Sequence, residues 1–187
     1  MRGRIQPICA WLVLAVAAGC ARPGLETIRA DAAAGQAHLI PGVPFVAQTE
    51  YQCGPASLAM VLRYYGAAVG QGEIARELYL PSLRGTLNLD LEFYARRRGF
   101  QARAFPGTLD RVRAELRADR PLIVFQDLGV PGYPVPHFAV LVGYDDRAGV
   151  VVLHSGTTAH RVVPYADFER SWERRRRWTL LVTPGGR

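Results

Sequence analysis

Among the three cysteines of the chain, Cys53 stands where a helix is predicted to begin, in the sequence Cys53-Gly54-Pro55-Ala56. A cysteine attacks a carbonyl as its thiolate, and a free thiol has a pKa of ~8.5, so it is mostly protonated at neutral pH. A helix N-terminus lowers that pKa, because its unpaired N–H groups and its dipole stabilise the anion. Pro55 fits the first helical turn, and Gly54 allows a sharp bend beside a substrate carbonyl. We therefore expect Cys53 to be an activated nucleophile; the alternative is a buried structural cysteine.

A glutamine, Gln48, lies five residues before this cysteine. Its side-chain amide is a suitable donor to the oxyanion that forms when a thiolate attacks a carbonyl, and losing one such donor lowers a rate by roughly a hundredfold to a thousandfold. Gln52 is nearer in the sequence and competes for this role. A glutamine considered alone is more often a solvated surface residue.

The base that such a thiol needs is best supplied by a histidine, and the chain has four: His38, His137, His154 and His160. His38 falls in a segment expected to be a tether, and His160 in a polar loop. His137 opens a strongly apolar stretch after the Gly- and Pro-rich loop GVPGYPVP. We therefore expect His137 at the edge of a sheet beside an open rim, where a general base is accessible; the alternative is a strand-end histidine with structural hydrogen bonds.

The periodicity of apolar residues predicts the elements that position these side chains. Helices are expected at 53–65, 72–79, 88–98, 108–118 and 165–172, and strands at 100–105, 121–126, 137–144, 150–155 and 178–183. The turn at 145–149 joins two of the strands as a hairpin. Because most helices precede an antiparallel sheet, the order predicts an α+β domain.

The same hairpin indicates which side chain orients His137. If the chain turns at residue 146 or 147, Ser155 or Thr157 lies ~5 Å from His137 on the neighbouring strand. Asp145 is roughly 26 Å along the strand and is too far away. A shift of one residue in the register would present His154 instead. We therefore expect a neutral orienting group, with Ser155 first and a backbone carbonyl or His154 as alternatives.

The N-terminus reads as an export signal over residues 1–19. Arg2 and Arg4 precede the apolar run 8–18, which is too short to span a bilayer of ~30 Å. Small residues before Cys20 resemble a lipobox, whose cysteine is acylated and becomes the new N-terminus. The alternative is ordinary cleavage beside an incidental cysteine.

This signal sets the expected organisation and location. Residues 20–40 are expected to form a lipidated N-terminus and tether, and residues 41–187 the folded domain. Ala21 after the lipidated cysteine resembles the sorting pattern for the outer membrane, so we expect an envelope protein that faces the periplasm. Cys9 leaves with the signal and Cys20 is acylated, which makes Cys53 the one thiol of the mature chain.

Taken together, Gln48, the run CGPASL at 53–58, and Pro136-His137-Phe138 leading into 142–145 resemble the papain-like cysteine peptidases of the bacteriocin-processing family. Those enzymes cut leader peptides after a double glycine. The resemblance extends over residues 43 to about 183. It implies a papain-like fold with helices packed on an antiparallel sheet, Cys53 as nucleophile, His137 as base and Gln48 as oxyanion donor.

The chain departs from that family in two respects. The family's triad ends in Asp, whereas the corresponding stretch here is Leu153-His154-Ser155-Gly156. After residue 20 no apolar run approaches the 18 residues of a transmembrane helix, so no transporter domain accompanies the peptidase. We therefore expect cleavage of an envelope or exported polypeptide, with a non-catalytic, substrate-docking lipoprotein as the alternative.

Composition argues against other classes of function. The net charge is +7, and every basic residue that contributes to it is an arginine. The arginine runs at 96–98 and 174–177 are interpreted as solvated faces. Neither a zinc-ligand pattern nor an aromatic nucleic-acid-binding motif accompanies them. We expect a polypeptide substrate and membrane contact through the lipid, with no cofactor, metal or nucleic acid; the oligomeric state is not predicted.

Overall fold

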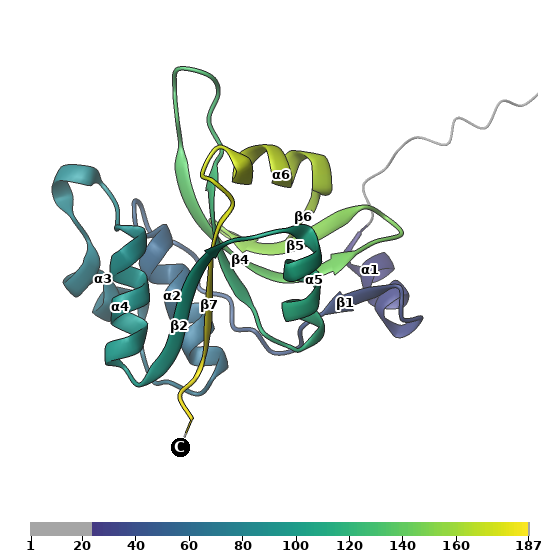
Figure 1. Ribbon diagram of the computed structural model, residues 1–187, viewed down its shortest axis with the longest axis horizontal. Coiled ribbons are helices and arrows are strands. Elements are labelled where there is room, and N and C mark those ends of the chain that lie inside the picture. Colours follow the sequence, from purple (N-terminus) through teal and green to yellow (C-terminus); the bar gives the residue numbers. More distant parts are fainter. Residues whose placement is uncertain (1–23, 187) are drawn as a thin grey trace, which may run out of the picture.

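The computed structural model describes residues 24–186, and it consists of an antiparallel sheet with helices on its sides (Figure 1). The strands follow the order β2-β7-β3-β4-β5-β6, and β1 pairs with β4 outside this path. Their bounds are β1 Ala37–Leu39, β2 Phe100–Pro106, β3 Leu122–Asp127, β4 Pro136–Asp145, β5 Val150–Ser155, β6 Thr158–Pro164 and β7 Trp178–Pro184. The predicted α+β class, with N-terminal helices packed on an antiparallel sheet, is confirmed.

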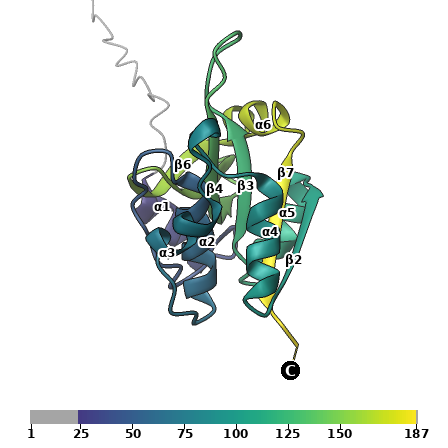
Figure 2. The ribbon, with the colours of Figure 1, turned by 90° about the vertical axis from the view of Figure 1, so that its left-hand side faces the viewer.

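The helices agree with the predicted ones to within one or two residues at their ends. They are α2 Cys53–Tyr64, α3 Gln71–Leu78, α4 Asn88–Arg97, α5 Leu109–Arg117 and α6 Tyr165–Glu173, with a short 3-10 helix at Pro81–Leu83. In Figures 1 and 2, α2, α3 and α4 gather on one side of the molecule, while α6 lies near β5 and β6. Thr108 is the N-cap of α5, and its hydroxyl accepts the N–H of Arg111 at 3.2 Å.

The core is formed by α2 and the central strands. Leu58, Met60 and Leu62 are fully buried, as are Val140 and Val152 on the sheet. Residues 54–62 of α2 are buried without interruption, and so are all residues of β5, so these elements are covered on more than one side. Packing of α2 on β4 fixes the start of α2 next to the start of β4, which is where the cysteine and the histidine lie.

The sequence predicted a tether over residues 20–40, but residues 24–40, the part that the structure describes, pack on the domain. Residues Leu25–Ala33 form α1, and β1 pairs with the far end of β4. Ile28 and Ile40 are buried, and Arg147 binds the Asp31 carboxylate through two nitrogens at 3.0 and 2.7 Å. These contacts join segments over a hundred residues apart, so local sequence patterns could not reveal them. The expected signal at 1–19 and Cys20 lie outside the described residues.

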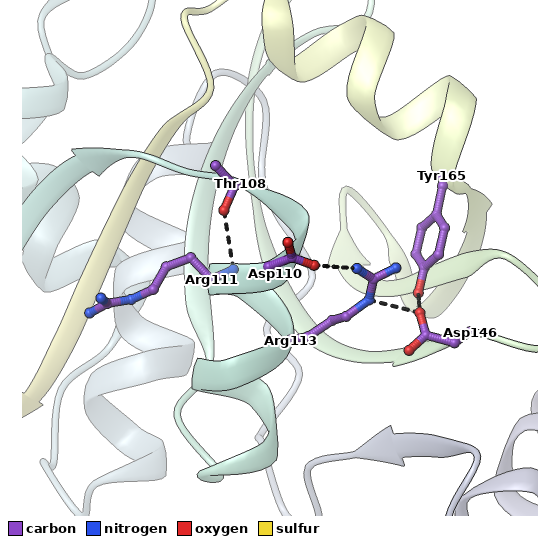
Figure 3. A network of polar contacts seen from close by, with 6 residues as sticks. All are labelled: Thr108, Asp110, Arg111, Arg113, Asp146 and Tyr165. Atoms are coloured by element: carbon purple, nitrogen blue, oxygen red, sulfur yellow. Dashed lines mark hydrogen bonds and ion pairs between the residues drawn. The ribbon is translucent and has the colours of Figure 1, made fainter.

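A polar network holds the β4–β5 turn to the helices on either side of it (Figure 3). Arg113 of α5 donates to Asp110 at 2.9 Å and to Asp146 of the turn at 2.7 Å, and the Tyr165 hydroxyl of α6 donates to Asp146 at 2.7 Å. Burial and the bond to Asp146 raise the pKa of Tyr165. The network therefore fixes the hairpin on which the histidine and Ser155 are carried.

Strand β6 was not predicted. Its sequence, TAHRVVP, lacks a clear alternation and follows a tight turn in which Gly156 adopts a φ of +61°. It pairs with β5 and forms one edge of the sheet. Within residues 24–186, no helix has both the length and the apolar character that crossing a bilayer requires.

Candidate active site

Cys53 is the first residue of α2 and is partly buried. Burial against the sheet is the largest influence on its thiol and raises its pKa, although the backbone N–H groups of Phe138, Gly54 and Cys53 itself oppose this by favouring the anion. The expectation of a lowered pKa is therefore corrected. The helix N-terminus does stabilise negative charge here, but desolvation outweighs it, and the resting form is the thiol.

The loop before α2 is held in place by a residue that the sequence did not single out, Gln71. The Gln71 carboxamide is oriented so that both its nitrogen and its oxygen are hydrogen-bonded. The nitrogen donates to the Ala47 carbonyl at 3.1 Å, and the oxygen accepts the Thr49 N–H at 3.2 Å. The amides of Gln71 and Gln52 lie 2.9 Å apart. Gln52 is thus directed to α3, which removes it as the competitor of Gln48.

Gln48 points toward the start of β4 instead. Its side-chain nitrogen donates to the Phe138 carbonyl at 3.3 Å, and its backbone N–H donates to the Gly156 carbonyl at 3.0 Å. A carboxamide nitrogen carries two hydrogens, so a second N–H remains for a substrate oxygen. Gln48 and Cys53 therefore meet at the backbone of Phe138, one residue after His137.

His137 lies near the start of β4 and is partly buried. Its Nε2 is 2.9 Å from the Ser155 Oγ, which is the contact expected from the hairpin. Burial, with a smaller contribution from the positive charge of Arg161, lowers the pKa of His137 to about 4. The imidazole is therefore neutral at neutral pH and able to accept a proton.

The other candidates for the third position are placed elsewhere. His154 is fully buried; its Nε2 is 3.2 Å from the Val43 carbonyl, and its Nδ1 accepts the His160 N–H at 3.1 Å. Burial lowers the pKa of His154 to about 4, so it is a neutral structural residue. Asp145, at the far end of β4, pairs in register with Ala37 and Val150.

The thiol of Cys53 and the imidazole of His137 both neighbour the Phe138 backbone, without a direct hydrogen bond between them. Among residues 24–186, the His137 side chain is hydrogen-bonded to Ser155 but not to the sulfur of Cys53. Hydrogen bonds between catalytic groups are often long in a free enzyme and tighten when substrate binds. The absence of this bond therefore does not argue against proton transfer from Cys53 to His137.

No group of three or more His, Cys, Asp or Glu side chains in the described part of the chain could hold a metal ion. The reactive groups that the structure brings together at this site are the thiol of Cys53, the imidazole of His137 and the carboxamide of Gln48. The roles assigned to Cys53, His137, Gln48 and Ser155 stay predictions, because the geometry brings these residues together without testing their action.

A cysteine at the start of a helix, with a histidine at the start of a neighbouring antiparallel strand, defines a papain-like cysteine peptidase domain. The profile of the Peptidase_C39 like family matches residues 40–179, and the chain belongs to this family. No curated protein is significantly similar to it in sequence.

Several solved structures share the fold. A putative C39-like peptidase from Bacillus anthracis is 19% identical with a TM-score of 0.64, covering 81% of this chain and 100% of its own. The peptidase domain of Streptococcus ComA, a bifunctional ABC transporter involved in quorum sensing, is 19% identical with a TM-score of 0.64, covering 76% and 99%. A double glycine motif protease from an AMS/PCAT transporter, crystallised with its leader peptide, is 23% identical with a TM-score of 0.62, covering 79% and 94%.

Proposed function

We propose that the protein is a cysteine peptidase that cleaves an envelope or exported polypeptide through Cys53 and His137. The observation that carries the proposal is the convergence of Gln48 and Cys53 on the backbone of Phe138, directly after a neutral His137. The solved relative crystallised with its leader peptide supports a polypeptide as the substrate.

In the proposed reaction, His137 accepts the proton of the Cys53 thiol as the sulfur attacks the scissile carbonyl. The negative charge moves from the sulfur to the carbonyl oxygen, where the side-chain amide of Gln48 stabilises it. The imidazolium then protonates the leaving amine, and water hydrolyses the thioester with His137 again acting as base. Ser155 holds the ring by its hydrogen bond to Nε2 and thereby positions the other ring nitrogen toward the thiol.

A hollow of about 480 Å³ near the site suits an extended polypeptide. Phe125 and Trp178 line it, and both rings pack on Phe138, with centroids at 4.4 and 5.8 Å. Arg176 also lines the hollow and has no carboxylate partner among the described residues, whereas Arg175 pairs with Asp127. This combination favours a substrate with an apolar side chain next to an acidic residue.

The proposed location is the cell envelope, with the chain anchored through an acylated Cys20 and facing the periplasm from the outer membrane. The support is the signal-like sequence at 1–19 and Ala21. Two or three acyl chains give stable anchoring, since each buried methylene contributes ~0.8 kcal/mol. Labelling with a radioactive fatty acid, lost in Cys20→Ala, tests this part of the proposal.

One observation favours the alternative, a non-catalytic docking module on the same fold. The third position is occupied by the neutral Ser155, which stabilises an imidazolium less than a carboxylate does. A docking module would bind peptides equally well after Cys53→Ser and would turn none of them over.

The deciding experiment compares N-terminal peptides of envelope proteins from cells that carry the wild type, Cys53→Ala or Ser57→Ala. Ser57 is buried one turn further along α2, so its substitution is a matched control for the fold. We expect a set of new N-termini in the wild type and in Ser57→Ala that is missing in Cys53→Ala. Identical sets in all three strains would contradict the peptidase function.

A further inference from the structure

A polar cavity of about 240 Å³ adjoins the candidate active site on the side of Ser155. It lies between β3, β5, β6 and α6, and its lining includes Ser155, Gln126, Ser171, Arg161, Arg170 and Arg174. A water molecule occupies about 30 Å³ in the liquid, so the cavity has room for a small organic ion with several waters.

The charges around this cavity do not balance. Asp127 pairs with Arg175 at 3.0 Å, and Asp167 pairs with Arg170 at 3.0 Å. Arg174 donates to the Gly129 carbonyl at 2.6 Å rather than to a carboxylate.

In the described part of the chain Arg161, like Arg174, has no carboxylate partner, and it is the arginine of the cavity whose charge acts on His137. It stands on the edge strand β6, opposite Leu153 of β5, and among residues 24–186 it has no carboxylate within 4.0 Å. Three guanidinium groups and two carboxylates therefore line the cavity, and Arg175 outside it pairs with one of the carboxylates, that of Asp127. The positive charge of Arg161 also disfavours the protonated imidazole of His137. The cavity is thus electrostatically prepared for an anion.

The hydroxyl of Ser155 adds a directed hydrogen-bond donor. When His137 acts as a base, its Nε2 carries a hydrogen and donates to the Ser155 Oγ at 2.9 Å. A hydroxyl has one hydrogen of its own to donate. Among the described residues, Ser155 has no other side-chain partner that could accept this hydrogen, while the residue lines the cavity.

We propose that this cavity binds a carboxylate. Arg161 pairs with the carboxylate, and the Ser155 hydroxyl donates a hydrogen bond to it. The bound carboxylate then assists His137 through Ser155, which lies between them. The inference rests on the proposed function, because it assigns His137 the role of base. The carboxylate accepts from Ser155, Ser155 accepts from His137, and the imidazolium formed during attack faces a negative charge through one hydroxyl. The ligand is either a small free carboxylate or an acidic side chain of the polypeptide substrate.

The effect on His137 follows from the sign of the charges. Arg161 disfavours the imidazolium, and a carboxylate on Arg161 cancels that charge and adds its own attraction. A rise of one unit in the pKa of His137 corresponds to a tenfold gain in its proton affinity. We therefore expect peptide turnover to increase at saturating carboxylate, by up to about tenfold for each unit of that rise.

The test is a titration of the purified Cys53→Ala protein with sodium acetate at pH 7 and constant ionic strength, followed through the NMR signals of the His137 imidazole. We expect a saturable shift that is lost on adding Arg161→Gln and kept on adding Arg63→Gln, which removes an exposed arginine at the far end of α2. Absence of a saturable shift, or a shift that survives Arg161→Gln, would overturn the proposal.

A second arm separates the two sources of the carboxylate. N-acetyl-glutamate amide and N-acetyl-glutamine amide replace acetate in the same titration. Tighter binding of the glutamate compound than of acetate supports a side chain of the substrate, and equal or weaker binding supports a free anion. The binding assay uses Cys53→Ala and therefore does not depend on catalysis. If acetate binds but the wild type cleaves no peptide, the proposed function is refuted and the anion site still stands.

Discussion

The pH dependence of Cys53 alkylation distinguishes a buried thiol from a thiolate–imidazolium pair. Burial raises the pKa of Cys53 and lowers that of His137 to about 4. If the ordinary thiol pKa of ~8.5 is taken as a lower limit, at most about 0.3% of the sulfur is thiolate at pH 6. Transfer of the thiol proton to an imidazole of pKa about 4 populates the ion pair in fewer than roughly one molecule in ten thousand.

The free thiolate is therefore the species that reacts, and its population follows pH. We expect the second-order rate constant for iodoacetamide to rise about tenfold per pH unit from 6 to 8, or roughly a hundredfold overall. Mass spectrometry of the Cys53 peptide measures the rate without interference from other cysteines. The protein unfolded in guanidinium chloride, whose thiol has its ordinary pKa, should react faster than the native protein at each pH.

His137→Ala is the matched variant in this assay. Because the ion pair contributes so little, the substitution should leave the slope of the alkylation profile unchanged while it abolishes peptide turnover. A rate constant that is constant from pH 6 to pH 8 and falls in His137→Ala would show a preformed ion pair. That result would refute the conclusion that desolvation outweighs the helix N-terminus at Cys53.

Three further predictions concern charge. Ser155→Asp should raise the pKa of His137 from about 4 by at least about one unit in an NMR titration, because opposite charges ~4 Å apart attract by about 4 kcal/mol at an effective dielectric constant of 20, before desolvation of the new carboxylate. Asp145 is buried with a raised pKa, so its ionised form destabilises the fold as pH rises, and Asp145→Asn should increase the melting temperature by a few degrees at pH 7 but not at pH 3. Asp146→Ala should lower the free energy of unfolding by about 1 kcal/mol in urea titrations by removing two hydrogen bonds of the network in Figure 3, whereas Asp110→Ala, at an exposed carboxylate, should change it by less than about 0.5 kcal/mol.

The elements of the domain could be predicted because their periodicity is local. The apolar stretch of α2 and the hairpin of β4 and β5 are evident in the sequence, and the hairpin register placed Ser155 beside His137. The register is not simple, since it shifts between Leu141 and Gly143. Ser155 still reaches the imidazole because it lies diagonally across from His137, a neighbour position that long side chains in a sheet can span.

The parts that the sequence did not reveal depend on contacts distant in the chain. Nothing in the Ala-rich stretch at 25–40 indicates that Asp31 meets Arg147, or that β1 adds to β4. The pKa of Cys53 is a similar case. A helix start is visible in the sequence, whereas desolvation depends on how closely the sheet packs over the thiol.

Gln71 illustrates the same limit within the site. As an isolated glutamine at the start of α3, it carries no signal of its own, yet it ties the loop that sets both Gln48 and Cys53. A loop anchor of this kind acts through backbone carbonyl and N–H groups, whose positions are decided by the fold. Sequence patterns readily identify the groups that can react, but they identify the groups that hold those in place less well.

The site in its resting form carries no charge on Cys53, His137 or Ser155, and this shapes how it can accelerate a reaction. Neutral groups pay little desolvation penalty in a partly buried position, but no thiolate is ready before substrate arrives. In the proposed reaction, charge develops only as the sulfur attacks, on the imidazole and on the carbonyl oxygen. Gln48 would then stabilise the oxyanion, and a negative charge near His137 would stabilise the imidazolium, which the positive charge of Arg161 disfavours unless the proposed anion neutralises it.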